Sequence, residues 1–143
     1  MKKLKIALVG VGQRGLQHLQ ALSDLKDEEL ISIQALVDPF KENLDNEKIK
    51  SYVPNYDEKG VKYFNKFNEM VDSVNVDAIW FVIPPNQHKN EIIYAADKGI
   101  AIFAEKPQSL FLDEVFLWQK QLKKKMFLLF VGFKWNTIHG IQK

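Results

Sequence analysis

Three glycines near the start of the chain, Gly10, Gly12 and Gly15, form the pattern GVGQRG. The pattern directly follows an apolar run and opens a segment of helical period, which is the context that a dinucleotide-binding turn requires. The first glycine permits a tight turn, the second lets a pyrophosphate approach the backbone, and the third lets the helix pack close to the sheet. Gln13 and Arg14 lie inside the turn, and the guanidinium of Arg14 can reinforce an anion site. The sequence therefore predicts a nucleotide site, and the alternative is a tight turn that binds nothing.

Asp38 ends the next apolar run of the chain. An acidic side chain at this place accepts hydrogen bonds from the adenosine ribose hydroxyls and repels a 2′-phosphate, which favours NAD over NADP. Lys41 is the nearest cation and weakens that preference without reversing it. Asp38 followed by Pro39 is also typical of a helix start, with the aspartate as N-cap and the proline in the first turn. One residue can fill both roles.

A third cluster, FVIPPNQHKNE at residues 81–91, joins a buried run to a proline pair and a helical segment. His88 shares a helical stripe with Ile92 and Ala95, so we expect it in the first turn of a helix. Its imidazole would then face the carboxyl edge of the strands, where ligands bind in open α/β sheets. A packing or capping histidine is the alternative, and the pattern does not decide between the two.

The run IAIFA at residues 100–104 ends abruptly in Glu105, Lys106 and Pro107. Charges often mark the point where a strand leaves the core, so a solvated strand end is the simplest interpretation. Pro107 biases Lys106 toward extended backbone, and the ammonium would then project from the sheet edge. This is the fourth cluster predicted at the same edge, and the convergence favours a site.

The elements that position these residues follow from the hydrophobic pattern. Six short runs rich in β-branched and aromatic residues predict strands at 5–10, 31–38, 61–64, 77–83, 100–104 and 126–133. Segments of helical period lie at 13–25, 86–98 and 111–125, whereas the polar segment 39–56 allows at most a short helix before or around Pro54. Strand and helix in alternation predict an α/β fold with a mostly parallel, six-stranded, doubly wound sheet covered on both faces.

Composition narrows the classes of protein. The chain has 143 residues, of which 46% are hydrophobic, enough for one well-cored domain. Its net charge of +2 comes from dispersed lysines, which argues against a nucleic-acid surface. The chain has no cysteine, which excludes disulfides, a thiolate nucleophile and Cys-ligated metal, and we predict no metal site. Because no apolar stretch approaches a membrane span and no signal peptide is evident, we expect a cytoplasmic protein without a membrane partner.

Five segments resemble, in order and spacing, the amino-terminal half of the glucose-fructose oxidoreductase / inositol dehydrogenase / MocA family. They are KIALVGVGQRGLQHLQAL, VDP, DAIWFVIPPNQH, FAEKP and LLFVGF, and Glu105-Lys106-Pro107 is the most specific part. The resemblance implies a three-layer Rossmann domain over residues 1–131 that binds NAD or NADP. Residues 132–143 would be a tail leading into a second α/β domain, which we expect to be absent from this chain.

The same resemblance implies roles for individual residues. The cofactor would be held by Gly10, Gly12, Gln13, Arg14, Gly15, Asp38, Pro84 and His88. Glu105 would lie at the nicotinamide, and Lys106 would touch a sugar, cyclitol or related polyol substrate. A fixed ammonium stabilises the alkoxide character that develops as hydride leaves the carbinol carbon. The general base, often a histidine with an aspartate in the family, would come from the second domain.

The chain departs from the family pattern at Ile83, where a threonine is usual, and at 134–136, where an arginine is usual. Three interpretations therefore stay open. In the first, the chain is the cofactor half of an oxidoreductase, with little or no turnover by itself. In the second, it is a stand-alone dinucleotide-binding sensor or carrier. In the third, it is an interaction protein that kept the fold without the ligand. In the last case the C-terminal strand and tail, with Phe133 and Trp135, would present apolar surface for self-association.

Overall fold

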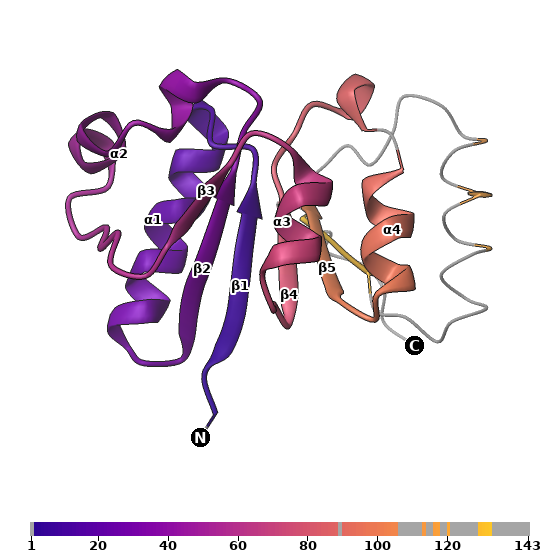
Figure 1. Cartoon of the computed structure of the whole chain (residues 1–143), viewed down its shortest axis with the longest axis horizontal. Helices are drawn as coiled ribbons and strands as arrows, with labels where there is room; N and C mark the ends of the chain where they lie inside the picture. The colour runs from indigo at the N-terminus through magenta and orange to yellow at the C-terminus, as the bar shows by residue number, and fades with distance from the viewer. Residues whose placement is uncertain are drawn as a thin grey trace, which may run out of the picture.

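The structure is a computed structural model that describes residues 2–88, 90–105 and 129–132, together with Asp113, Phe116, Leu117 and Lys120. Six parallel strands form one sheet in the order β3-β2-β1-β4-β5-β6 (Figure 1). The strands are β1 (Leu4–Val9), β2 (Ile31–Val37), β3 (Lys62–Phe64), β4 (Ala78–Phe81), β5 (Ala101–Glu105) and β6 (Leu129–Gly132). Each lies on one of the six runs predicted from the sequence.

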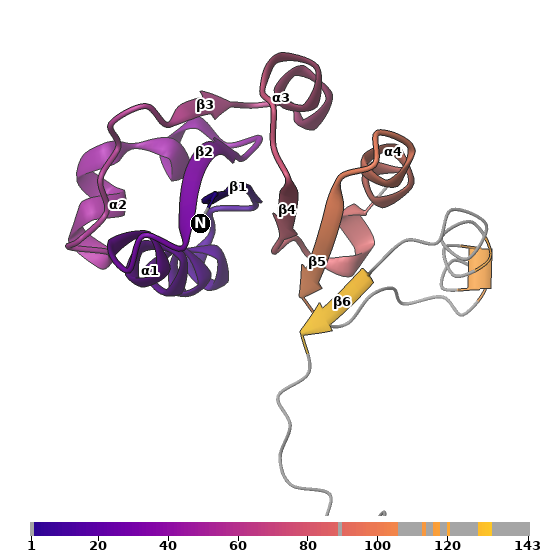
Figure 2. The ribbon, with the colours of Figure 1, turned by 90° about the horizontal axis from the view of Figure 1, so that it is seen from below.

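The described helices are α1 (Gln13–Asp27), α2 (Asn46–Tyr52), α3 (Phe67–Ser73) and α4 (Glu91–Asp97), with 3₁₀ turns η1 (Lys41–Leu44) and η2 (Pro85–Gln87). They cover both faces of the sheet, with α1 and α2 on one side and α3 and α4 on the other (Figure 2). The predicted three-layer, doubly wound Rossmann architecture is confirmed.

Each face of the sheet has its own hydrophobic core. On the α1 face, Leu16, Leu19 and Leu22 pack with Ile49 of α2 against β1 and β2. On the opposite face, side chains of α3 and α4 pack against β1, β4 and β5, and Phe81 and Ile79 are fully buried there. The central strand β1 is buried continuously from Ile6 to Val9, because helices cover both of its faces.

The strand order reverses between β1 and β4. From β1 the chain proceeds outward through β2 to β3, and it then returns to the other side of β1 and proceeds through β4 and β5 to β6. The connections that leave the carboxyl ends of β1 and β4 therefore diverge to opposite faces, which opens a crevice between them. Open α/β sheets bind ligands at this position.

Two helix predictions need correction. The segment 86–98 is not one helix, since η2 ends at Gln87 and α4 begins only at Glu91, so His88 lies between them rather than in a first helical turn. Asn86 and Asn90 explain the interruption, because asparagine favours turns and caps over helix interiors. The helix α3 was missed, because its apolar residues Phe67, Met70 and Val71 span too few positions to establish a helical period.

Other predictions hold or lie outside the described residues. Within 39–56 a short helix forms, α2, which Asp45 caps by accepting a hydrogen bond from the Lys48 N–H at 2.8 Å. Of the predicted helix at 111–125, the four described residues are helical and exposed, and the tail 133–143 lies outside the described residues. None of the helices in the described ranges is long and apolar enough to cross a membrane.

Candidate cofactor site

The glycine-rich turn connects β1 to α1, and its three glycines have different structural roles. Gly10 has φ +92°, and a Cβ atom there would lie 2.2 Å from the Val82 carbonyl oxygen. A Cβ atom at Gly15 would lie 2.0 Å from the Gly10 carbonyl oxygen. A Cβ atom at Gly12 would meet nothing within 4 Å. Gly10 and Gly15 are therefore required by close packing, whereas Gly12 keeps a space open above the turn.

The start of α1 faces that open space. Gly12 is the N-cap, no side chain caps the helix, and the first turn contains no acidic residue. The first intrahelical bond runs from the Leu16 N–H to the Gly12 carbonyl, at 2.9 Å, so the N–H groups of residues 13–15 precede it. A helix start of this kind offers unpaired N–H groups and the positive end of the helix dipole to an anion.

Among the cavities beside the turn, two lie at the carboxyl ends of the strands. The larger, about 430 Å³, lies between the ends of β1 and β2, the start of α3 and the loop after β4, and Pro39, Phe67 and Glu91 line it. The smaller, about 300 Å³, lies between the turn and the ends of β4 and β5, and Pro84 and Glu105 line it. Ile83 lines both cavities. Together they form a groove with two compartments on either side of the strand-order reversal.

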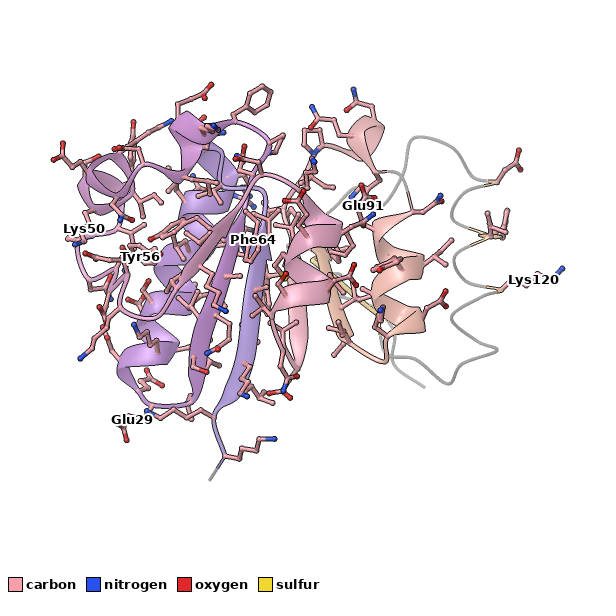
Figure 3. All side chains as sticks on the ribbon, in the orientation of Figure 1. Glu29, Lys50, Tyr56, Phe64, Glu91 and Lys120 are labelled. Carbon is pink, nitrogen blue, oxygen red and sulfur yellow. The ribbon has the colours of Figure 1, made fainter. Side chains whose placement is uncertain are left out.

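Labelled side chains show the orientation of this groove in Figure 3. Glu91, at the start of α4, lies toward the carboxyl edge of the strands, and Glu29, just before β2, lies at the opposite edge. The groove and the described residues of the four predicted clusters therefore belong to the edge marked by Glu91.

Asp38 lies immediately after β2 and is buried, with 4% of its surface exposed. Its Oδ2 accepts a hydrogen bond from the Val11 N–H at 2.8 Å. Its Oδ1 accepts from the Phe40 N–H at 2.9 Å and from Asn43 Nδ2 at 3.1 Å. The bond to Phe40 closes a turn two residues long and places Phe40, not Asp38, at the N-cap of η1. The carboxylate thus connects the glycine-rich turn to the segment after β2.

Glu105 ends β5 and forms an ion pair with Arg14 of α1. Its Oε1 accepts from Arg14 Nε at 3.2 Å and from Arg14 Nη2 at 3.1 Å, while Arg14 Nη1 donates to Gln17 Oε1 at 2.7 Å. The Glu105 side chain is 12% exposed and the Arg14 side chain 59% exposed. Arg14, predicted to reinforce the anion site, is thus engaged with a carboxylate at the far wall of the smaller cavity.

His18 lies one turn after Arg14 on α1 and faces the other oxygen of Glu105. Its Nε2 is 3.7 Å from Glu105 Oε2, and its Nδ1 accepts a hydrogen bond from Trp80 Nε1 at 3.2 Å. The bond from Trp80 places the proton of the neutral imidazole on Nε2, toward the carboxylate. Burial lowers the pKa of His18, the Glu105 carboxylate opposes this, and Arg14 adds to the lowering. His18 is therefore neutral near pH 7 and leaves the charge of Glu105 in place.

The family model of the Gfo/Idh/MocA proteins, an oxidoreductase family with an NAD-binding Rossmann fold, matches residues 4–133. The chain belongs to this family. Within the Gfo/Idh/MocA family, myo-inositol 2-dehydrogenase of Thermotoga maritima is 29% identical over 130 residues, which are 91% of this chain and 36% of that protein. The rhizopine catabolism protein MocA of Rhizobium meliloti is 26% identical over 114 residues, which are 80% of this chain and 32% of that protein.

Solved structures show the same relationship. Scyllo-inositol dehydrogenase from Lactobacillus casei, with bound NAD(H) and scyllo-inositol, superposes with a TM-score of 0.73 at 26% identity. The match covers 92% of this chain and 36% of that one. The chain thus spans about a third of the length of the Gfo/Idh/MocA relatives it matches.

The remaining predicted residues differ in where they lie. Pro84 lines the smaller cavity, as do Gln13 and Arg14. His88 is half-buried and its ring lies 6.2 Å from that of Phe81, a packing contact, and it lines neither cavity of the groove. Lys106 lies outside the described residues. In the described part of the chain, no group of three acidic or histidine side chains is placed to hold a metal ion.

The sequence analysis missed His18 and Trp80 as neighbours of the site. His18 had a local signal, since it lies four residues after Arg14 and therefore on the same face of the predicted helix. Trp80 had none, because only the pairing of β4 with β5 brings its ring against Phe103, with ring centroids 4.0 Å apart.

Proposed function

We propose that this chain binds a nicotinamide dinucleotide in the two-compartment groove, as the cofactor half of an oxidoreductase acting on a sugar, cyclitol or related polyol. The observation that carries the proposal is Gly12, which lines the smaller cavity and whose missing side chain leaves open space beside the uncapped start of α1. A pyrophosphate fits that position, because it needs close backbone approach and N–H donors.

The orientation of the cofactor follows from the strand order. In doubly wound sheets the adenosine ribose lies beside the end of the second strand, so the larger cavity would hold the adenosine. The smaller cavity, on the β4 and β5 side, would then hold the nicotinamide half, with Pro84 near its ribose and Glu105 at its wall. His88 would contribute to this half by packing the loop after β4 rather than by direct contact.

Asp38 supports NAD rather than NADP as the favoured cofactor, through the second of the two reasons in the sequence prediction, repulsion of a 2′-phosphate. Its oxygens already accept hydrogen bonds from Val11, Phe40 and Asn43. Its negative charge nevertheless lies beside Val37 and Pro39, which line the larger cavity, and a 2′-phosphate there would be repelled. Repulsion by a fixed charge, more than bonding to the ribose, is the basis of the proposed preference.

Turnover needs groups beyond the described groove. When bound, the nicotinamide supplies the hydride acceptor for oxidation of a carbinol carbon. Lys106, next to Glu105 in sequence, would stabilise the developing alkoxide through its ammonium. The base that takes the hydroxyl proton would come from a second domain, so we expect cofactor binding from this chain with little or no turnover.

The test is cofactor binding by the chain and by Gly12→Val, whose Cβ atom would enter the open space and meet no protein atom within 4 Å. We expect NAD or NADH to raise the free energy of unfolding of the wild-type chain, by about 2.7 kcal/mol at a hundredfold excess over Kd. Gly12→Val should lose this stabilisation while keeping the unliganded stability within about 1 kcal/mol. Calorimetric titration and thermal unfolding measure both.

Ser73→Val is the matched control, because it also introduces a valine, at an exposed position at the end of α3 that lies away from the groove. It should bind cofactor like the wild type. Binding that survives in Gly12→Val, or absent binding in the wild type, would contradict the proposed function.

A further inference from the structure

The ion pair of Glu105 and Arg14 places two opposite charges at the wall of the smaller cavity, but the two are not equally screened. Both residues line that cavity. The Glu105 side chain is 12% exposed, whereas the Arg14 side chain is 59% exposed. Because solvent screens exposed charges more strongly than buried ones, the carboxylate dominates the local potential in the cavity.

The contacts of Glu105 also fix the position of its charge. Arg14 donates two hydrogen bonds to Oε1 alone, from Nε and Nη2. Oε2 receives no charged donor among the described residues, since its neighbour at 3.7 Å is Nε2 of His18, a group that burial keeps neutral. The carboxylate is therefore held in one place and is only partly neutralised.

The two redox forms of the cofactor differ in charge at the nicotinamide ring, which is cationic when oxidised and neutral when reduced. The reduced ring also carries a second hydrogen at C4, and the rest of the dinucleotide is the same in both forms. A fixed charge near the ring therefore changes the ratio of the two affinities, while the glycine-rich turn and the adenosine compartment change both affinities equally.

We propose that Glu105, held by Arg14, determines the preference of this site for the oxidised cofactor over the reduced one. The inference rests on the proposed function, since it needs the nicotinamide in the smaller cavity. Arg14 has two opposing effects: it positions the carboxylate, and its own charge limits how strongly the carboxylate favours the cationic ring.

The experiment measures Kd for NAD⁺ and for NADH by calorimetry in three variants and the wild type. In Glu105→Gln the amide oxygen can still accept from Arg14, but the negative charge is gone, so NAD⁺ should lose affinity relative to NADH by about threefold to tenfold. In Arg14→Gln the carboxylate is no longer neutralised, so the ratio should move in the opposite direction, even where both affinities fall.

Glu29→Gln is the matched control. Glu29 also forms an ion pair, with Lys3 at 3.2 Å, but it lies at the opposite edge of the sheet (Figure 3), so this variant should leave the ratio unchanged. An unchanged ratio of the two affinities in Glu105→Gln would overturn the inference while the proposed function stands. If both affinities fall equally, Glu105 is only structural. Failure of the wild type to bind either form would overturn the proposed function and the inference with it.

Discussion

Two carboxylates end two strands at the same edge of the sheet, Asp38 after β2 and Glu105 at the end of β5, yet they are held in opposite ways. Asp38 is 4% exposed, and two of its three donors are backbone N–H groups. Among the described residues, the hydrogen-bond donors to Glu105 belong to the side chain of Arg14, which is largely exposed. The Asp38 carboxylate is therefore part of the fold, whereas the Glu105 carboxylate is held by an ion pair with a largely exposed side chain.

The two carboxylates differ in the donor groups that would lose their acceptor if each carboxylate were removed. Without Asp38 the N–H groups of Val11 and Phe40 lose their acceptor, and Val11 is fully buried, so water cannot replace the bond. Without Glu105 the guanidinium of Arg14 remains largely in solvent, where hydration replaces the lost pair. An acidic residue therefore has a structural role at the end of β2, and we propose an electrostatic role for the one at the end of β5.

Asp38→Ala should give the largest effect. It removes three hydrogen bonds to a charged acceptor and leaves a buried N–H group unpaired, so we expect the free energy of unfolding to fall by about 3 kcal/mol. Urea denaturation of the chain without cofactor measures this. A loss below about 1 kcal/mol would show that the carboxylate does not stabilise the turn, and would remove the contrast with Glu105.

Glu105→Gln should have a much smaller effect on the same measurement. Its partner is exposed, and exposed ion pairs contribute about 0.2–1 kcal/mol, so the unfolding free energy should change by less than about 1 kcal/mol. The variant that alters cofactor preference would then be nearly as stable as the wild type. A loss as large as that of Asp38→Ala would place Glu105 among the structural residues.

The sequence predicted the architecture well, because it depends on strong local patterns. Strands buried on both faces appear as continuous apolar runs, and Gly10, Gly12 and Gly15 identify the turn between β1 and α1. Boundaries were predicted less well where the signal was weak. The seven residues of α3 are too few to show a period, and asparagines interrupt the segment that became η2 and α4.

Several residues that line the groove could be named from the sequence, but their pairings could not. The sequence analysis named both Arg14 and Glu105, but they are 91 positions apart, and their contact depends on where β5 lies relative to the start of α1. It also assigned Asp38 to the ribose, with a cap as the alternative, and could not show that the Val11 N–H lies 2.8 Å from its carboxylate. Contacts of this kind follow from sheet order and register, which local patterns do not encode.

The smallest and most specific effect is expected at His18, because its Nε2 lies 3.7 Å from Oε2 of Glu105 and its pKa depends on that charge. Its pKa in the folded chain lies below the usual value of about 6.5, so between these two values the unfolded chain binds more protons than the folded one. The free energy of unfolding should therefore fall as the pH decreases through this window. Above the window the contribution of His18 to stability should be fully present. His18→Asn, which keeps an acceptor for Trp80, should reduce this part of the pH dependence.

A titration of the His18 ring followed by NMR separates the two neighbouring charges. Glu105 opposes the lowering of the His18 pKa and Arg14 adds to it, so Glu105→Gln should lower the pKa further and Arg14→Gln should raise it. A His18 pKa that stays the same in both variants would mean that the carboxylate is not held beside α1, and the proposed means by which Glu105 distinguishes the two redox forms would then be lost.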